Sequence, residues 1–206
     1  MAAIHIGISG WRYTPWRGDF YPKGLPQKRE LQFASRAVNS IEINGSFYAL
    51  QRPDRYARWY AETPPHFIFS VKAPRFITHI KRLRDIHKPL ANFFASGVLE
   101  LKEKLGPILW QFPPNFTFDA ELFEIFLDQL PHDTEQAAAL AHQHDSHLIA
   151  PRQKLSARKS REVFCYFDND IKVRAPFDAR RLLERFDLDR NLLTAPGEPV
   201  AEGALS

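Results

Sequence analysis

The sequence alternates short apolar segments with longer amphipathic ones, and this alternation restricts its fold more than any other feature. The short segments have the composition of strands and span residues 4–8, 40–44, 67–72 and 108–111. The segments between them have apolar residues at helical spacing and span 28–38, 53–62, 89–105 and 119–130. Strands and helices that alternate in this way form a parallel sheet covered by helices. The sequence therefore predicts an α/β fold whose ligands collect at the carboxyl ends of the strands.

The alternation stops after Pro131 and resumes only near the end of the chain. Residues 142–161 show no strand pattern, although 137–140 allow one short helix. A strand at 163–167 is then followed by a helix that begins at Pro176. The 206 residues are also fewer than the ~250 of a complete eightfold β/α barrel. We therefore predict four β/α units in 1–131, a junction in 132–162 that replaces missing units, the last unit in 163–190 and a flexible tail in 191–206.

Polar residues interrupt the apolar pattern of the second strand. Glu42 and Asn44 point to one side of this strand while Ile41 and Ile43 point to the other, because side chains alternate along a strand. A carboxylate inside a sheet that is covered on both faces is costly unless it is paired, hydrogen-bonded or next to a cavity. Glu42 is therefore a candidate catalytic residue and Asn44 a candidate substrate-binding residue. A hydrogen-bonded carboxylate with a purely structural role is the alternative for Glu42.

Basic residues follow the third strand. Lys72 ends this strand, where it could pair with Glu42 or bind an anionic group, and Arg75 and His79 lie just beyond it. We predict Lys72 and His79 as catalytic residues and Arg75 as a substrate-binding residue, with a loop histidine of no special role as the alternative for His79. Gln111 ends the fourth strand, and because it can donate and accept hydrogen bonds it either orients a substrate or caps the strand.

The last strand also ends in polar residues, Asp168, Asn169 and Asp170. They suit a hydroxylated substrate or part of a divalent-cation site, but they are also ordinary turn formers. Because their spacing lacks a complete ligand set, we predict no metal site and place Asp168 and Asn169 among the substrate-binding residues. The sequence identifies no cofactor.

Composition restricts the partners of the chain. The net charge of +4 and the isoelectric point near 9.2 favour anionic ligands only weakly. The basic residues of 152–161 have no aromatic residue among them for base stacking, which argues against nucleic acid binding. No apolar run is long enough to span a bilayer, the first residues lack the pattern of a secretory signal, and Cys165 is the only cysteine. We therefore expect a cytoplasmic protein that binds no membrane.

A series of motifs resembles those of the domain-of-unknown-function-72 family, also called YecE-like. The resemblance covers about residues 4–131 and 163–186. It rests on Gly7-Ile8-Ser9-Gly10-Trp11, Phe20-Tyr21-Pro22, Ser40-Ile41-Glu42-Ile43-Asn44, Phe47-Tyr48, Val71-Lys72-Ala73, Ile77-Thr78-His79, Gly106-Pro107-Ile108-Leu109-Trp110-Gln111-Phe112-Pro113-Pro114 and Tyr166-Phe167-Asp168-Asn169-Asp170. The resemblance implies a TIM-like β/α barrel with polar residues of these motifs around the carboxyl ends of the strands. For this reason Trp11 and Tyr48 join the predicted substrate-binding residues.

Two departures from the family pattern bear on the fold and the site. The family usually has Asn where this chain has Asp168, and several tens more residues precede its final strand. The loss of about three units leaves two unpaired sheet edges, which a closed barrel does not have. The chain then has three ways to fold or fail: a smaller curved sheet in which the last strand pairs with the first, self-association through the open edges, or decay into a product of poor solubility.

Three functional outcomes fit these residues. The first is an enzyme, or the descendant of one, that acts on a small polar or anionic substrate. In it Glu42 is the general acid or base, Lys72 and Arg75 stabilise charge, and His79 is a proton shuttle. The second is a non-catalytic binding or interaction protein that recruits a partner through the open sheet edge or the basic segment. The third is a truncated, inactive remnant.

Overall fold

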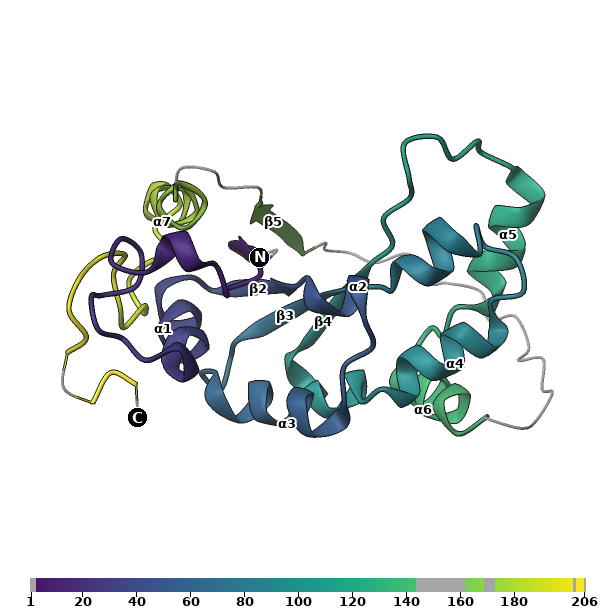
Figure 1. Ribbon diagram of the computed structural model, residues 1–206, viewed down its shortest axis with the longest axis horizontal. Coiled ribbons are helices and arrows are strands. Elements are labelled where there is room, and N and C mark those ends of the chain that lie inside the picture. The colour runs from purple at the N-terminus through teal and green to yellow at the C-terminus, as the bar shows by residue number, and fades with distance from the viewer. Residues whose placement is uncertain (1–2, 144–161, 169–172, 202, 206) are drawn as a thin grey trace.

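The computed structural model of the chain describes residues 3–143, 162–168, 173–201 and 203–205. In these ranges five parallel strands form one curled sheet in the order β4-β3-β2-β1-β5 (Figure 1). The strands are β1 (Ile4–Ser9), β2 (Ser40–Ile43), β3 (Ile68–Lys72), β4 (Leu105–Leu109) and β5 (Val163–Phe167). The predicted α/β fold, an incomplete β/α barrel with the first four units and the last one, is therefore confirmed.

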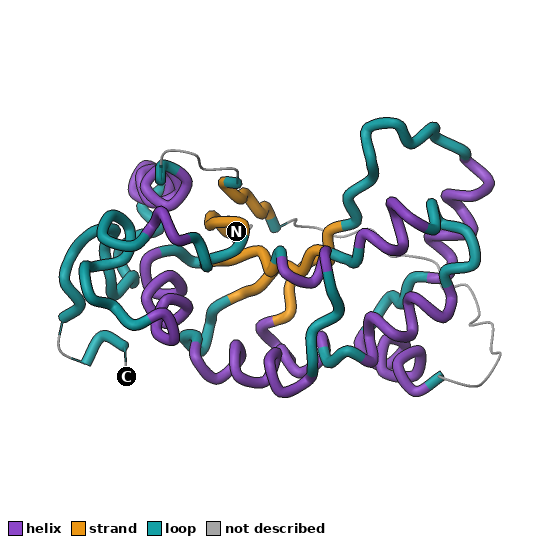
Figure 2. The backbone as a smooth tube through the Cα atoms, in the orientation of Figure 1, coloured by secondary structure: helices purple, strands orange, loops and turns teal. Residues whose placement is uncertain are grey.

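Helices connect the strands and pack against the sheet or against one another. The α-helices are α1 (Glu30–Ala37), α2 (Gly45–Tyr48), α3 (Pro53–Glu62), α4 (His87–Ala95), α5 (Ala120–Gln129), α6 (Thr134–His142) and α7 (Ala175–Arg185). Tighter or wider turns form the 3₁₀-helices η1 (Thr14–Trp16), η2 (Gln27–Arg29) and η4 (Val98–Lys104) and the π-helix η3 (Phe76–Ile80). Figure 2 shows α4, α5 and α6 gathered at one end of the molecule. No helix in the described ranges is long and apolar enough to cross a membrane.

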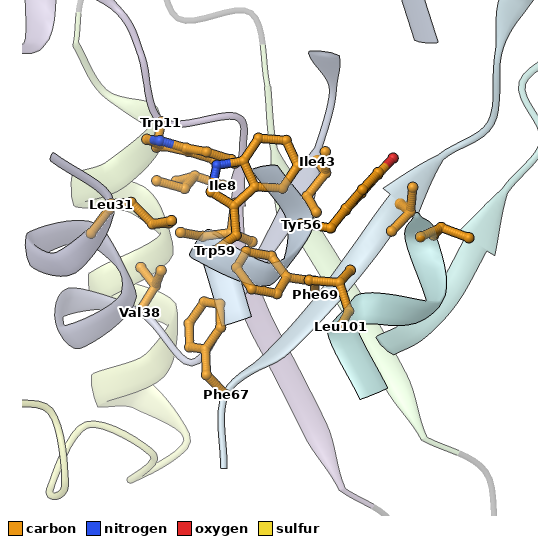
Figure 3. Close-up of a cluster of buried hydrophobic side chains, with 14 of the residues drawn as sticks. Ile8, Trp11, Leu31, Val38, Ile43, Tyr56, Trp59, Phe67, Phe69 and Leu101 are labelled. Atoms are coloured by element: carbon orange, nitrogen blue, oxygen red, sulfur yellow. The ribbon is translucent and has the colours of Figure 1, made fainter. Parts of the chain in front are cut away.

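The main hydrophobic core lies between the sheet and the first helices. Ile8, Ile43 and Phe69 belong to a buried cluster that is completed by Leu31, Val38, Tyr56 and Trp59, from α1, its end and α3 (Figure 3). Burying each of these large side chains contributes roughly 1.5–3 kcal/mol. Because neighbours along a strand face opposite sides, the placement of Ile43 in this core turns Glu42 to the other side of the sheet.

That other side, called here the inner face, carries small or polar residues at Gly7, Ser9, Ser40, Glu42, Ser70 and Lys72. Two aromatic residues of β5 cover it. The hydroxyl of Tyr166 is 2.7 Å from that of Ser40, and Phe164 Cε1 lies 3.6 Å from the position that a β-carbon at Gly106 would occupy. Small residues on β1 to β4 thus leave room for the rings of the last strand.

The two edge strands show how the last strand is placed in the shortened barrel. β5 pairs with β1 in parallel from Ile4 and Val163 to Ile8 and Phe167. Within the described residues β5 has no second neighbour, and β4 pairs only with β3. The chain therefore forms the smaller curved sheet in which the last strand pairs with the first.

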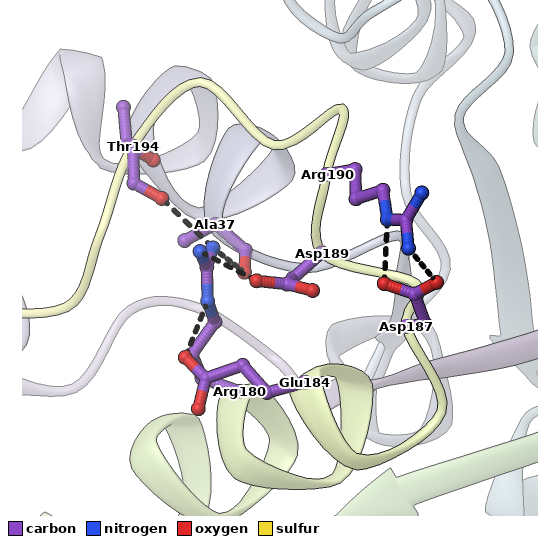
Figure 4. Close-up of polar contacts among 7 residues, drawn as sticks. All are labelled: Ala37, Arg180, Glu184, Asp187, Asp189, Arg190 and Thr194. Atoms are coloured by element: carbon purple, nitrogen blue, oxygen red, sulfur yellow. Dashed lines mark hydrogen bonds and ion pairs between the residues drawn. The ribbon is translucent and has the colours of Figure 1, made fainter.

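The segment that follows α7 lies against α1. Arg180 makes ion pairs with Glu184 at 3.2 Å and Asp189 at 3.7 Å, and its guanidinium donates to the carbonyl of Thr194 at 3.2 Å (Figure 4). The Thr194 hydroxyl in turn donates to the carbonyl of Phe33 in α1 at 2.9 Å. The part of 191–206 around Thr194 is thus held against the first helix. The basic run at 152–161 lies outside the described residues.

Two sequence expectations about element boundaries are wrong. The helix expected over 89–105 ends after α4 and continues as η4, because Gly97 has a left-handed φ of 102° and lies where a β-carbon would come within 2.4 Å of the Pro53 α-carbon. The strand expected at 108–111 spans Leu105–Leu109 and contains Pro107. Proline is tolerated there because β4 is an edge strand, where a missing N–H costs little.

Replacing Gly7 with alanine is expected to destabilise the sheet strongly. The new β-carbon would lie 1.8 Å from the carbonyl oxygen of Ser40, so the backbone of β1 or β2 would have to move. We expect the free energy of unfolding in urea to fall by about 3 kcal/mol. Gly45→Ala is the matched control, since its nearest neighbour would be Gln51 Nε2 at an ordinary 3.6 Å. Equal stability of the two variants would contradict the structure.

Tyr166 offers a test that depends on pH. Burial raises the pKa of Tyr166 to about 12, although its hydrogen bond with Ser40 lowers it. Because this pKa lies above the unfolded value near 10, the neutral hydroxyl stabilises the fold below pH ~10, and that stability is lost as the pH rises towards 12. Tyr166→Phe should be less stable than the wild type by about 1 kcal/mol at pH ~8, and the gap should close with rising pH. Urea unfolding at several pH values measures it, and a constant gap would refute this role of Tyr166.

Candidate functional site

The carboxyl ends of β1 and β2 hold a buried carboxylate. Glu42 is only 4% exposed, and its Oε2 accepts a 2.5 Å hydrogen bond from the hydroxyl of Ser9, which lies opposite it in register. Tyr13 supports the same strand end, because its hydroxyl donates to the Ser9 carbonyl at 2.7 Å. Among the described residues Glu42 has no ion-pair partner within 4.0 Å. A hydroxyl group, and not a cation, therefore orients this carboxylate.

Tyr13 and Asn44 extend this group towards the solvent. Burial raises the pKa of Tyr13 and its hydrogen bond with Asn44 lowers it, while the negative charges of Asp168 and Glu42 raise it further. These four side chains are therefore electrostatic neighbours. Asn44 Oδ1 is buried and accepts no hydrogen bond from any described residue. A buried carbonyl oxygen without a donor is costly, so a ligand with an N–H or O–H group would gain affinity by donating to it.

A cationic group lies at the carboxyl end of β3. Lys72 is 8% exposed, and its Nζ lies over the Phe47 ring, 5.0 Å from the ring centroid. His79, on the π-helix η3, meets the same ring edge to face with the centroids 5.2 Å apart. Burial lowers the pKa of His79, and the positive charges of Arg75 and Lys72 lower it further. The imidazole is therefore neutral at neutral pH and able to accept a proton.

Lys72 and Glu42 do not form the ion pair that the sequence allowed. Neither has an ion-pair partner within 4.0 Å in the described part of the chain. The register explains the separation, because Glu42 lies opposite Ser70 and Lys72 is two residues further along β3. Its ammonium group contacts the Phe47 ring instead. The carboxylate and the ammonium thus occupy neighbouring strands of the inner face as separate charges.

Two cavities open at this end of the sheet. The first, of about 610 Å³, is called here the tryptophan cavity, and its lining includes the predicted residues Trp11, Asn44, Tyr48 and Asp168. The second, of about 780 Å³, is lined by Arg75, Tyr48 and residues of η3 and α4. Tyr48 is 67% exposed and lines both. The structure therefore gathers most of the predicted residues around one end of the sheet.

Comparison with known proteins agrees with this architecture. The profile of the family described as "Protein of unknown function DUF72" matches residues 5–152, which is more than half of the chain. The chain belongs to the DUF72 family. The family predicted from the sequence motifs is therefore confirmed, and the match extends beyond Pro131 into the junction.

Two relatives of this DUF72 chain are longer than it is. It is 32% identical to the UPF0759 protein YunF of Bacillus subtilis in an alignment of 121 residues that covers 55% of this chain and 41% of YunF. It is 29% identical to the UPF0759 protein YecE of Escherichia coli K12 over 141 residues, 68% of this chain and 48% of YecE. The chain thus spans about half the length of these relatives or less. A solved DUF72 protein from Thermotoga maritima shares the fold, with a TM-score of 0.65 and 18% identity over 90% of this chain and 99% of that one.

Some predicted residues of the DUF72 chain stay apart from the site, and some residues of the site were not predicted. Gln111 is exposed and lies two residues beyond β4, and Asn169 lies outside the described residues. Glu42, Lys72, His79 and Gln111 line neither cavity. Ser9 could have been found, because it alternates with the apolar residues of β1 just as Glu42 does in β2. Tyr13 and Phe47 come from a loop and a one-turn helix, where no periodic signal exists.

The pKa of His79 tests the cationic group of the DUF72 chain. We expect this pKa to lie below 6.5, and to rise towards 6.5 in Lys72→Met and Arg75→Ala, because each variant removes a positive charge close to the imidazole. NMR titration of the His79 ring protons measures it. Lys23→Met, which removes an exposed lysine from another loop, should leave the value unchanged. A His79 pKa that none of these variants alters would contradict the arrangement.

Proposed function

We propose that this DUF72 chain binds a small polar or anionic molecule at the carboxyl ends of β1, β2 and β3, and that it acts on this molecule as an enzyme or descends from one that did. One observation carries the proposal. Glu42 and Lys72 are both buried on the inner face, on neighbouring strands, and neither is neutralised by an opposite charge among the described residues. Burying separate charges is costly, and a ligand that contacts both would offset that cost.

The geometry suggests a role for each group. Glu42, oriented by Ser9, acts as general acid or base. Lys72 and Arg75 hold an anionic part of the ligand, and His79, neutral near pH ~7, accepts or relays a proton. Around them, Trp11, Asn44, Tyr48 and Asp168 contact the rest of the ligand.

A second function, binding without turnover, is favoured by the open edges of the sheet. β4 and β5 end the sheet without further partners in the described residues. Groups that additional strands would contribute to the same end of a closed barrel are then missing. The groups at the carboxyl ends of β1, β2 and β3 would still recognise the ligand while lacking part of the catalytic machinery.

A metabolite screen by thermal shift tests the proposal. Ligands that stabilise the wild type should bind at least tenfold more weakly to Glu42→Gln and Lys72→Met, because each variant removes a charged hydrogen-bonding group. Glu100→Gln and Lys23→Met, which change exposed residues of the same types, serve as matched controls. If every ligand bound all four variants equally well, the site would be misplaced.

Product analysis of the same ligands separates the two functions. Turnover that disappears in Glu42→Gln while some binding remains identifies an enzyme. Binding without any product in the wild type identifies a non-catalytic protein.

A further inference from the structure

The wall of the tryptophan cavity is apolar and firmly packed. Trp11 and Trp59 meet edge to face with their centroids 5.2 Å apart, and they are 6% and 7% exposed (Figure 3). Leu31 and Ile43 complete this wall. Because the rings are held by the main core, the wall exists before any ligand binds. A volume of about 610 Å³ lies within the range of small-molecule sites.

The rim of the same cavity is cationic. Arg12, Lys28, Arg55 and Arg58 line it, against the carboxylates of Glu62 and Asp168. Arg12, Lys28 and Arg58 make no ion pair or side-chain hydrogen bond within the described ranges. An apolar wall beneath guanidinium groups that form no ion pair within the described residues is suited to a ligand that has a ring and a negative charge.

The guanidinium groups of Arg12 and Arg58 both influence the carboxylate of Glu62. Burial raises the pKa of Glu62, and the charges of Arg58 and Arg12 lower it. Both arginines are thus close enough to influence one carboxylate, although neither forms an ion pair with it within 4.0 Å. An anionic group of a ligand placed between them would receive hydrogen bonds from two forked donors.

We infer that the tryptophan cavity binds an aromatic anion. Its ring lies on Trp11 and Trp59, its phosphate or carboxylate lies between Arg12 and Arg58, and a hydroxyl or amine donates to Asn44 Oδ1. The inference goes beyond the proposed function. The two share Trp11 and Asn44, but the anionic group here lies at Arg12 and Arg58 and not at Lys72 and Arg75. The residues that set this class of ligand are Arg12 and Arg58, which the sequence did not predict as site residues.

Phenyl phosphate is the probe for this inference, and isothermal titration calorimetry measures its affinity for the full chain. We expect it to bind at least tenfold more tightly than inorganic phosphate or benzyl alcohol, because each of these offers only one of the two recognised groups. Arg12→Ala and Arg58→Ala should each weaken binding at least tenfold. Arg29→Ala is the matched control, since Arg29 is an exposed arginine of η2 that does not line the cavity.

Two results would overturn the inference. One is an affinity for phenyl phosphate no higher than for inorganic phosphate, and the other is equal affinity in Arg12→Ala, Arg58→Ala and Arg29→Ala. Both rim arginines are exposed, so the variants should keep the unfolding transition of the wild type. If phenyl phosphate gives one of these results but Glu42→Gln still weakens the binding of ligands from the screen, the inference is wrong and the proposed function stands. If phenyl phosphate binding depends on Arg12 and Arg58 while Glu42→Gln and Lys72→Met have no effect in the screen, the inference stands and the proposed function is wrong.

Discussion

The parallel pairing of β5 with β1 is the contact on which the rest of the structure depends. It joins strands more than 150 residues apart in the sequence, and closing such a long loop costs entropy that contacts across the sheet must offset. Phe164 and Tyr166 supply those contacts, because they reach across the inner face to Gly106 and Ser40. Helix α7 then packs against both strands. A sheet of five strands is thereby curled and covered without the units that close a full barrel.

The candidate site follows from this curl and from the alternation of side chains. The same rule that buries Ile43 beneath α3 turns Glu42 towards Ser9, and the register of β3 places Lys72 beyond the reach of Glu42. The carboxylate is held by a hydroxyl and the ammonium by an aromatic ring. Neither is therefore paired with an opposite charge within the described residues. The tryptophan cavity adds an apolar wall and a cationic rim at the same end of the sheet.

The sequence predicts what periodicity controls and misses what depends on distant packing. Local patterns predict the order of strands and helices, the side of the sheet to which Glu42 points, and the family. The break at Gly97 does not, because it arises where the chain meets Pro53 of α3. The pairing of β5 with β1 was one of three alternatives, since sequence cannot weigh loop closure against self-association. The sequence also does not show that Arg12 and Arg58 both lower the pKa of Glu62, because the loop of Arg12 and the helix α3 come together only in the folded chain.

Amide hydrogen exchange, followed by NMR, tests the pairing of the first and last strands most directly. The hydrogen-bonded amides of β5 should exchange as slowly as those of β1 and β2, because all three strands are released only when the sheet unfolds. Exchange of residues 163–167 at the rate of an unstructured peptide, with β2 and β3 still protected, would contradict this pairing. The inner face would then lack its aromatic cover, and the half-barrel would not be the folded unit of this chain.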